Sequence, residues 1–148
     1  MENFVLHFRN ASRAHAEDLL ATHDATRDEN RWIVEKGSEN IAVWIDVFKG
    51  SDSLSEYEPD EKTELLESLG GKPSITLSLH YRRNVQSEAH AMVLMTRFLS
   101  DERGIVDDNH GSLLNRSELC ERLHQFRAEA AHPVYRRSLW ERITQWFQ

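Results

Sequence analysis

The sequence predicts an α+β fold, a mixed or antiparallel sheet with helices packed on it. Segments with apolar residues at every second position alternate along the chain with segments whose apolar residues recur every three or four positions. Of the 148 residues, 39% are hydrophobic and 29% are charged, which is typical of a globular domain. Because no long linker or internal repeat divides the chain, we expect residues 1–148 to form a single domain.

The first half of the chain predicts a strand, a helix and a hairpin. Residues 3–9 alternate phenylalanine and leucine with other side chains, as strands do. Residues 11–22 are rich in Ala, Leu, Glu and Asp, which favours a helix. Residues 31–35 and 40–48 are β-branched and aromatic, with a turn between them. The second of these strands is apolar on both faces, which indicates a central position in the sheet.

A helix and a strand follow. Pro59 suits the first turn of a helix, and Gly70 with Gly71 ends it. Residues 74–81 alternate cleanly, which predicts a half-buried strand whose polar face includes His80. The order strand, helix, strand, strand, helix, strand opens like a ferredoxin-like unit, one arrangement that the sheet could take.

The second half predicts a helix over residues 86–101, a short hairpin over residues 105–114, and two further helices. Apolar residues at helical spacing define the first helix. Asn115 with Glu118 resembles a capping box at the start of the next helix. Beyond Pro133, a last helix carries aromatic residues that either dock it onto the domain or anchor a protein interface.

Negative charge is concentrated in one part of the chain. The formal net charge is −7. Residues 51–70, the acidic segment, carry seven carboxylates against Lys62, which is −6. Such a surface argues against nucleic acid as a partner and favours attraction of a basic protein at long range. The alternative is a solvated helix with its preceding loop.

The sequence indicates a cytoplasmic protein that does not enter a membrane. No apolar run approaches the roughly 18–20 residues that span a bilayer. The first nine residues lack the pattern of a secretory signal. Cys120 is the only cysteine, so no internal disulfide can form.

No catalytic residue, metal site or cofactor is expected, because the motifs of phosphate loops, nucleophile elbows and zinc sites are missing. Cys120 and His124 have zinc-ligand spacing but are only two ligands, so a buried thiol beside a surface histidine is the simpler interpretation. The turn Asp107–His110 lacks the calcium-loop pattern, and turn chemistry explains its composition.

Part of the second half is similar to a known family. The helix ending in Phe98-Leu99, the run Gly104-Ile105-Val106-Asp107-Asp108, the Gly111 turn, Leu113-Leu114 and the helix start Ser117-Glu118-Leu119 carry this similarity. Residues 86–126 thereby resemble bacterial immunity proteins, the antidotes encoded beside polymorphic or contact-dependent toxins. The resemblance implies binding of a cognate toxin domain, often a basic nuclease, and occlusion of its active site.

The sequence therefore predicts an immunity protein that binds a basic toxin, with no role for nucleic acid. The predicted partner-binding residues combine the acidic segment with the turn after residue 106: Asp52, Glu56, Tyr57, Glu58, Asp60, Glu61, Glu64, Asp107 and Asp108. The alternative function is a small enzyme or ligand-binding domain that uses the polar strand face around His80 and the Asp107–His110 turn. A deep pocket lined by His80, Asp107 and His110 would favour that alternative.

Overall fold

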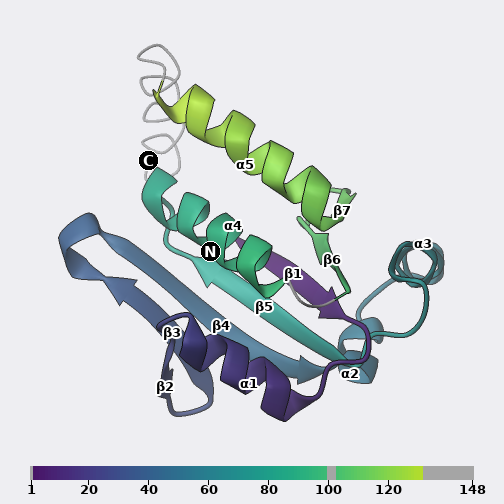
Figure 1. Cartoon of the computed structure of the whole chain (residues 1–148). Coiled ribbons are helices and arrows are strands. Elements are labelled where there is room, and N and C mark those ends of the chain that lie inside the picture. Colours follow the sequence, from purple (N-terminus) through teal and green to yellow (C-terminus); the bar gives the residue numbers. More distant parts are fainter. Residues whose placement is uncertain (1, 100–102, 132–148) are drawn as a thin grey trace.

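The computed structural model describes residues 2–99 and 103–131, and these residues form a seven-stranded antiparallel sheet with helices packed on it (Figure 1). The predicted α+β class is confirmed. The strand order is β2-β3-β4-β5-β1-β6-β7. The elements are, in chain order, β1 (Asn3–Phe8), α1 (Arg13–Thr22), β2 (Thr26–Asp28), β3 (Arg31–Lys36), the 3-10 helix η1 (Gly37–Glu39), β4 (Ile41–Lys49), α2 (Gly50–Leu54), α3 (Pro59–Leu69), β5 (Ile75–Tyr81), α4 (Val85–Phe98), β6 (Gly104–Asp107), β7 (Leu113–Leu114) and α5 (Arg116–Ala131).

The two faces of the sheet are covered differently. Helices α1, α4 and α5 supply the apolar partners of the strands on one face, where the main core lies. In Figure 1, α2 and α3 lie apart from these helices, at one end of the sheet. They pack on the other face through a small separate cluster of Leu65, Leu69 and Ile105. We call this second face the open face, and residues 50–69, which contain α2 and α3, the arm.

The sheet does not have the ferredoxin-like arrangement. A ferredoxin-like sheet is antiparallel throughout, and its first strand lies between the second strand of the hairpin and the last strand. Here β5 takes that place beside β4, and β1 pairs antiparallel with β5 and β6. Where β4 ends and β5 begins, the ladder between these two strands continues as the Gly50 N–H donates to the Ser74 carbonyl at 3.1 Å. Because this contact joins the end of β4 to the start of β5, the arm is an insertion in a wide hairpin.

Other boundaries and exposures also differ from the predictions. The helix expected over residues 86–101 runs from Val85 to Phe98, and β2 was not predicted because its three residues are exposed and polar. The strand expected to be half-buried is β5, yet Thr76 and Ser78 on its polar face are buried.

The helix predicted beyond Pro133, with its aromatic residues, lies outside the described residues. The capping box at α5 is confirmed by reciprocal hydrogen bonds between Asn115 and Glu118.

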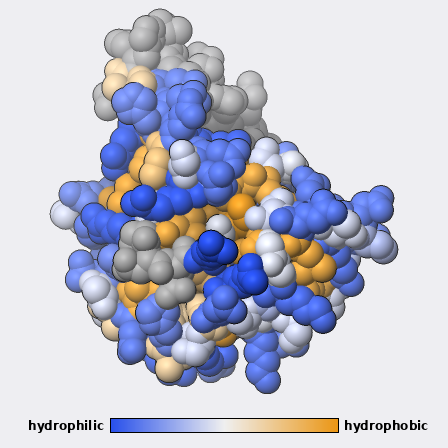
Figure 2. All heavy atoms as spheres, turned by 45° about the vertical axis from the view of Figure 1, so that its right-hand side comes forward, coloured by the Kyte–Doolittle hydropathy of each residue, from blue (hydrophilic) through white to orange (hydrophobic). Residues whose placement is uncertain are grey.

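The surface around the arm is mostly polar. From the side of α2 and α3, hydrophilic side chains dominate the view (Figure 2). Phe48 is the exposed large hydrophobic residue of residues 2–99 and 103–131, with 43% of its surface accessible. Within those ranges no helix combines the length and the apolar character needed to cross a membrane.

Replacing Gly50 by alanine should destabilise the fold, because a Cβ there would collide with the carbonyl of Pro73, in the segment that connects the arm to β5. We expect a loss of about 3 kcal/mol, the upper range for overpacking, measured as a lower urea midpoint. Gly37→Ala is the matched control, since a Cβ at Gly37 meets nothing within 4 Å. Equal midpoints for the two variants would contradict this role for Gly50.

Candidate functional site

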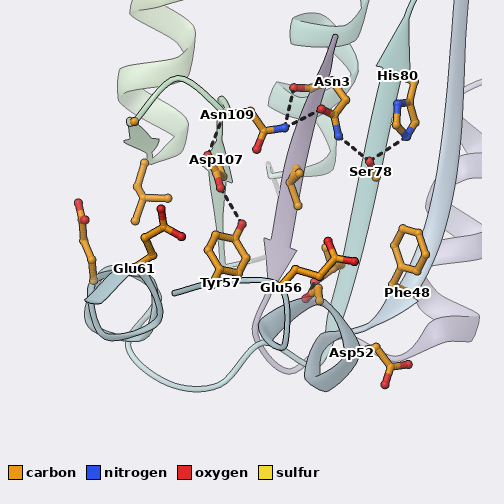
Figure 3. A pocket seen from close by; sticks show the side chains of 16 residues that line it. Asn3, Phe48, Asp52, Glu56, Tyr57, Glu61, Ser78, His80, Asp107 and Asn109 are labelled. Carbon is orange, nitrogen blue, oxygen red and sulfur yellow. Dashed lines mark hydrogen bonds between the residues drawn. The ribbon is translucent and has the colours of Figure 1, made fainter. Parts of the chain in front are cut away.

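The open face of the sheet and the arm border a cavity of about 720 Å³ that is open to solvent (Figure 3). Strands β1, β5 and β6 form its floor, with Val5, Thr76 and Ser78 among the lining residues. The arm forms one wall, and Phe48 at the end of β4 lies on the opposite side (Figure 3). We call this space the acidic cavity.

Carboxylates from two parts of the chain line the acidic cavity. They are Asp52, Glu56, Glu61 and Glu64 of the arm and Asp107 of β6. No Lys or Arg is among the described lining residues. For the side chains of Asp52, Glu56 and Glu64, no hydrogen bond or ion pair occurs with the described part of the chain. Because these negative charges repel one another without an internal counter-charge, the cavity favours a cationic occupant.

Tyr57 holds the arm against the floor of the cavity. Its hydroxyl donates to Asp107 Oδ2 at 2.6 Å and lies 2.9 Å from His7 Nε2. Since the hydroxyl proton is used for Asp107, His7 carries its own proton on Nε2 and donates to Tyr57. His7 Nδ1 then accepts from Thr76 Oγ1 at 2.9 Å. One tyrosine therefore joins the arm to β1 and β6, and through His7 to β5.

Burial governs the ionisation of these two rings. His7 is fully enclosed, and this desolvation lowers the pKa of His7 to about 4, although the negative charge of Asp107 opposes the shift. Desolvation, together with the hydrogen bond to Asp107, raises the pKa of Tyr57. At neutral pH the histidine is therefore uncharged, and the tyrosine keeps its proton.

A second hydrogen-bond chain crosses the floor. Asn109 Nδ2 donates to Asn3 Oδ1 at 2.6 Å, and Asn3 Nδ2 donates to Ser78 Oγ at 3.0 Å. His80 Nε2 lies 3.1 Å from Ser78 Oγ. These contacts connect β1, β5 and the turn after β6, as Figure 3 shows. The floor is therefore fixed by its own side chains before any ligand binds.

Ser78, His80 and Asp46 have the residue types of a catalytic triad but not its geometry. A triad uses the two ring nitrogens of histidine separately, one for the serine and one for the carboxylate. Here His80 Nε2 faces both Ser78 Oγ, at 3.1 Å, and Asp46 Oδ2, at 3.5 Å. Asp46 is also held by Arg31 through two hydrogen bonds. With Nε2 facing both groups, His80 cannot take the Ser78 proton on one nitrogen while Asp46 orients the ring through the other.

Six of the nine predicted partner-binding residues line the acidic cavity: Asp52, Glu56, Tyr57, Glu61, Glu64 and Asp107. Glu58, the N-cap residue of α3, and Asp60 in its first turn are exposed and do not line the cavity, and Glu58 forms a capping box with Glu61. Asp108 is buried and pairs with Arg122 on α5. Burial opposes ionisation of Asp108, yet hydrogen bonds from Arg122 and the backbone lower its pKa. Its role is therefore structural.

The structure divides the residues of the alternative site. His80 and Asp107 line the acidic cavity, whereas His110 lines a smaller cavity of about 170 Å³ beside Arg122 and Phe126. The expected buried thiol is wrong, because Cys120 is exposed. Within residues 2–99 and 103–131, no three His, Cys, Asp or Glu side chains are grouped to hold a metal ion.

Sequence reasoning missed His7, Asn3 and Phe48. The alternation of β1 places Asn3 and His7 opposite the apolar core residues, and the alternation of β4 places Phe48 opposite Val47. That signal assigns them to one face. Which helices cover that face depends on the sheet order, which the alternation does not contain.

Comparison with models of known families, with curated proteins and with solved structures finds no match to this chain.

Replacing Asp108 by alanine should cost about 2–3 kcal/mol of stability, because Arg122 and the N–H groups of His110 and Ser112 lose a buried acceptor. Urea unfolding measures the loss. The control is Glu67→Ala, an exposed carboxylate on α3 that should change stability by less than about 0.5 kcal/mol. A neutral Asp108→Ala variant would exclude the structural role.

Proposed function

We propose that the chain is a cytoplasmic, stoichiometric binding protein that neutralises a basic toxin domain by holding it at the acidic cavity and covering its active site. The observation that carries this proposal is the cavity itself, which gathers five carboxylates and no lysine or arginine among its described lining residues. A positively charged protein surface is the complement of such a site.

Electrostatics supports a basic protein as the partner. Like charges gathered in one place destabilise the free protein, and a cationic group relieves this repulsion when it binds. Carboxylates at an open surface also speed the encounter with a basic protein. Phe48, beside the cavity, adds an apolar contact of the kind that anchors protein interfaces.

Toxin neutralisation is the form of binding that the family resemblance suggests. The segment that resembles immunity proteins includes β6, the following turn and β7. Asp107, Asn109 and Leu113 from this segment line the acidic cavity. The resembling segment and the acidic segment therefore border the same surface, which supports one binding site built from both.

A small-ligand site is the second candidate. His80 and Asp107 lie in one cavity, and its volume falls in the range of about 300–1,000 Å³ that small ligands occupy. The ligand would be cationic for the same electrostatic reason. The contacts of His80 give no support to an enzyme that uses Ser78 as a nucleophile.

Co-expression with the adjacent reading frame tests the proposed function. We expect the product of that frame to be toxic alone, harmless with this protein, and recovered with it as a stoichiometric complex. A neighbour that is harmless alone, or that stays toxic in the presence of this chain, would exclude neutralisation of that product.

Replacing Glu56 or Glu64 by lysine should slow association with the toxin at least about tenfold and reduce the salt dependence of the rate. Stopped-flow or surface-plasmon measurements at two ionic strengths give both quantities. The matched control is Glu67→Lys, which changes the same charge on α3 outside the cavity. If Glu67→Lys slows association as much as Glu64→Lys does, net charge rather than the cavity guides binding.

A further inference from the structure

We propose that the arm is held on the sheet by a proton-sensitive latch, in which Tyr57 joins His7 to Asp107, and that mild acid releases the arm before the sheet unfolds. The latch belongs to the free protein and goes beyond the proposed function.

The geometry concentrates the attachment of the arm in few contacts. The Tyr57 hydroxyl lies 2.6 Å from Asp107 Oδ2 and 2.9 Å from His7 Nε2. Ser53 Oγ adds a contact of 2.8 Å to Thr76 Oγ1. The buried residues of the cluster beneath α3 are only Leu65, Leu69 and Ile105, separate from the main core. Segments with few buried apolar contacts open at lower free energy than the core of a protein.

The hydrogen bonds of the latch tolerate a proton on His7. Five contacts form a chain from the Gly50 carbonyl through Ser53, Thr76, His7 and Tyr57 to Asp107. A neutral His7 and an ionised Asp107 leave four protons for these five contacts, one from each intervening side chain. A fifth proton, on His7 Nδ1, would point the hydroxyls of Thr76 and Ser53 towards Gly50 and complete the chain. Hydrogen bonding within the closed latch therefore favours a proton on His7, and the desolvation of the ring acts against it.

What opposes protonation is the enclosure of the ring. Desolvation lowers the pKa of His7 to about 4 from its ordinary value of 6.5. The groups facing His7 are Asp107 on β6, Thr76 on β5, and Ser53 and Tyr57 on the arm, with Glu56 and Glu61 near Tyr57. None of them is a cation. Release of the arm hydrates the ring and removes the penalty.

The sign of the pH dependence follows. The open state binds a proton more tightly than the closed state at every pH between about 6.5 and 4, so lowering the pH through this range favours the open state. From pH 7 to pH 5 the opening constant should rise roughly 20-fold. Ordinary carboxyl groups stay largely ionised above about pH 5, so histidines rather than carboxyl groups titrate in this range.

Release would also dismantle the acidic cavity, because the arm supplies four of its five carboxylates. If the proposed function holds, the toxin should therefore dissociate faster at pH 5 than at pH 7. The latch itself is tested without any partner.

Amide hydrogen exchange of the whole free protein tests the latch, comparing residues 50–69 with β5 at pH 7 and pH 5 after correction for intrinsic exchange rates. We expect the arm to open more readily than β5 at both pH values, and its opening constant to rise about 20-fold on acidification. If the arm and β5 share one opening constant, the arm does not open separately and the latch is excluded.

Variants assign the effect to His7. His7→Gln should abolish the rise in the arm, whereas His80→Gln, which alters another histidine on the open face, should retain it. Tyr57→Phe should open the arm already at pH 7. A rise that persists in His7→Gln overturns the proposal. If that variant does not fold, the ring of His7 in the native protein decides by NMR: titration near pH 6.5 with the arm closed overturns the latch, and titration near pH 4 supports it.

Discussion

The contact on which the open face depends is the hydroxyl of Tyr57 between His7 and Asp107. A sheet has two faces, and here three helices bury only one of them. The other face carries buried polar groups, His7 and Thr76, which need partners because an unsatisfied buried polar group costs about 1–3 kcal/mol. The arm supplies these partners through Tyr57 and Ser53. The arm is therefore part of the fold as well as part of the site.

The same contact determines where the negative charge lies. Four carboxylates of the arm face one cavity because Tyr57 and Ser53 fix the arm beside Asp107. Without that attachment, these residues would belong to an acidic helix in solvent. The free-energy cost of gathering like charges is offset by the burial of Leu65, Leu69 and Ile105 and by the hydrogen bonds of Tyr57. A cationic partner would relieve the repulsion that remains, which is the physical basis of the proposed binding.

The hydrogen-bonded floor gives the cavity a fixed shape. Asn3, Ser78 and Asn109 bond to one another across two strands and a turn, so few side chains need to reorder when a ligand binds. Preorganisation of this kind lowers the entropic cost of association. The floor does not have the geometry of a catalytic triad, since His80 faces both Ser78 and Asp46 with the same ring nitrogen. In the proposed function the rigid floor serves recognition, and in the proposed latch the lightly attached arm serves control.

The sequence by itself determined the α+β class, most elements of the described chain and the concentration of charge in the arm, because periodicity, capping residues and charge are local properties. It could not determine the sheet order, which consists of pairings between distant strands, such as β1 with β5 and β6. For the same reason only the tertiary structure shows that Glu64 lines the cavity and that Asp60 does not. It also pairs Asp108 with Arg122 of α5, a contact that local patterns do not contain. The role of His7 was decided in the same way, since its partners come from β5 and the arm. Local patterns assign a residue to an element and a face, whereas the pairing of distant strands decides what that face meets.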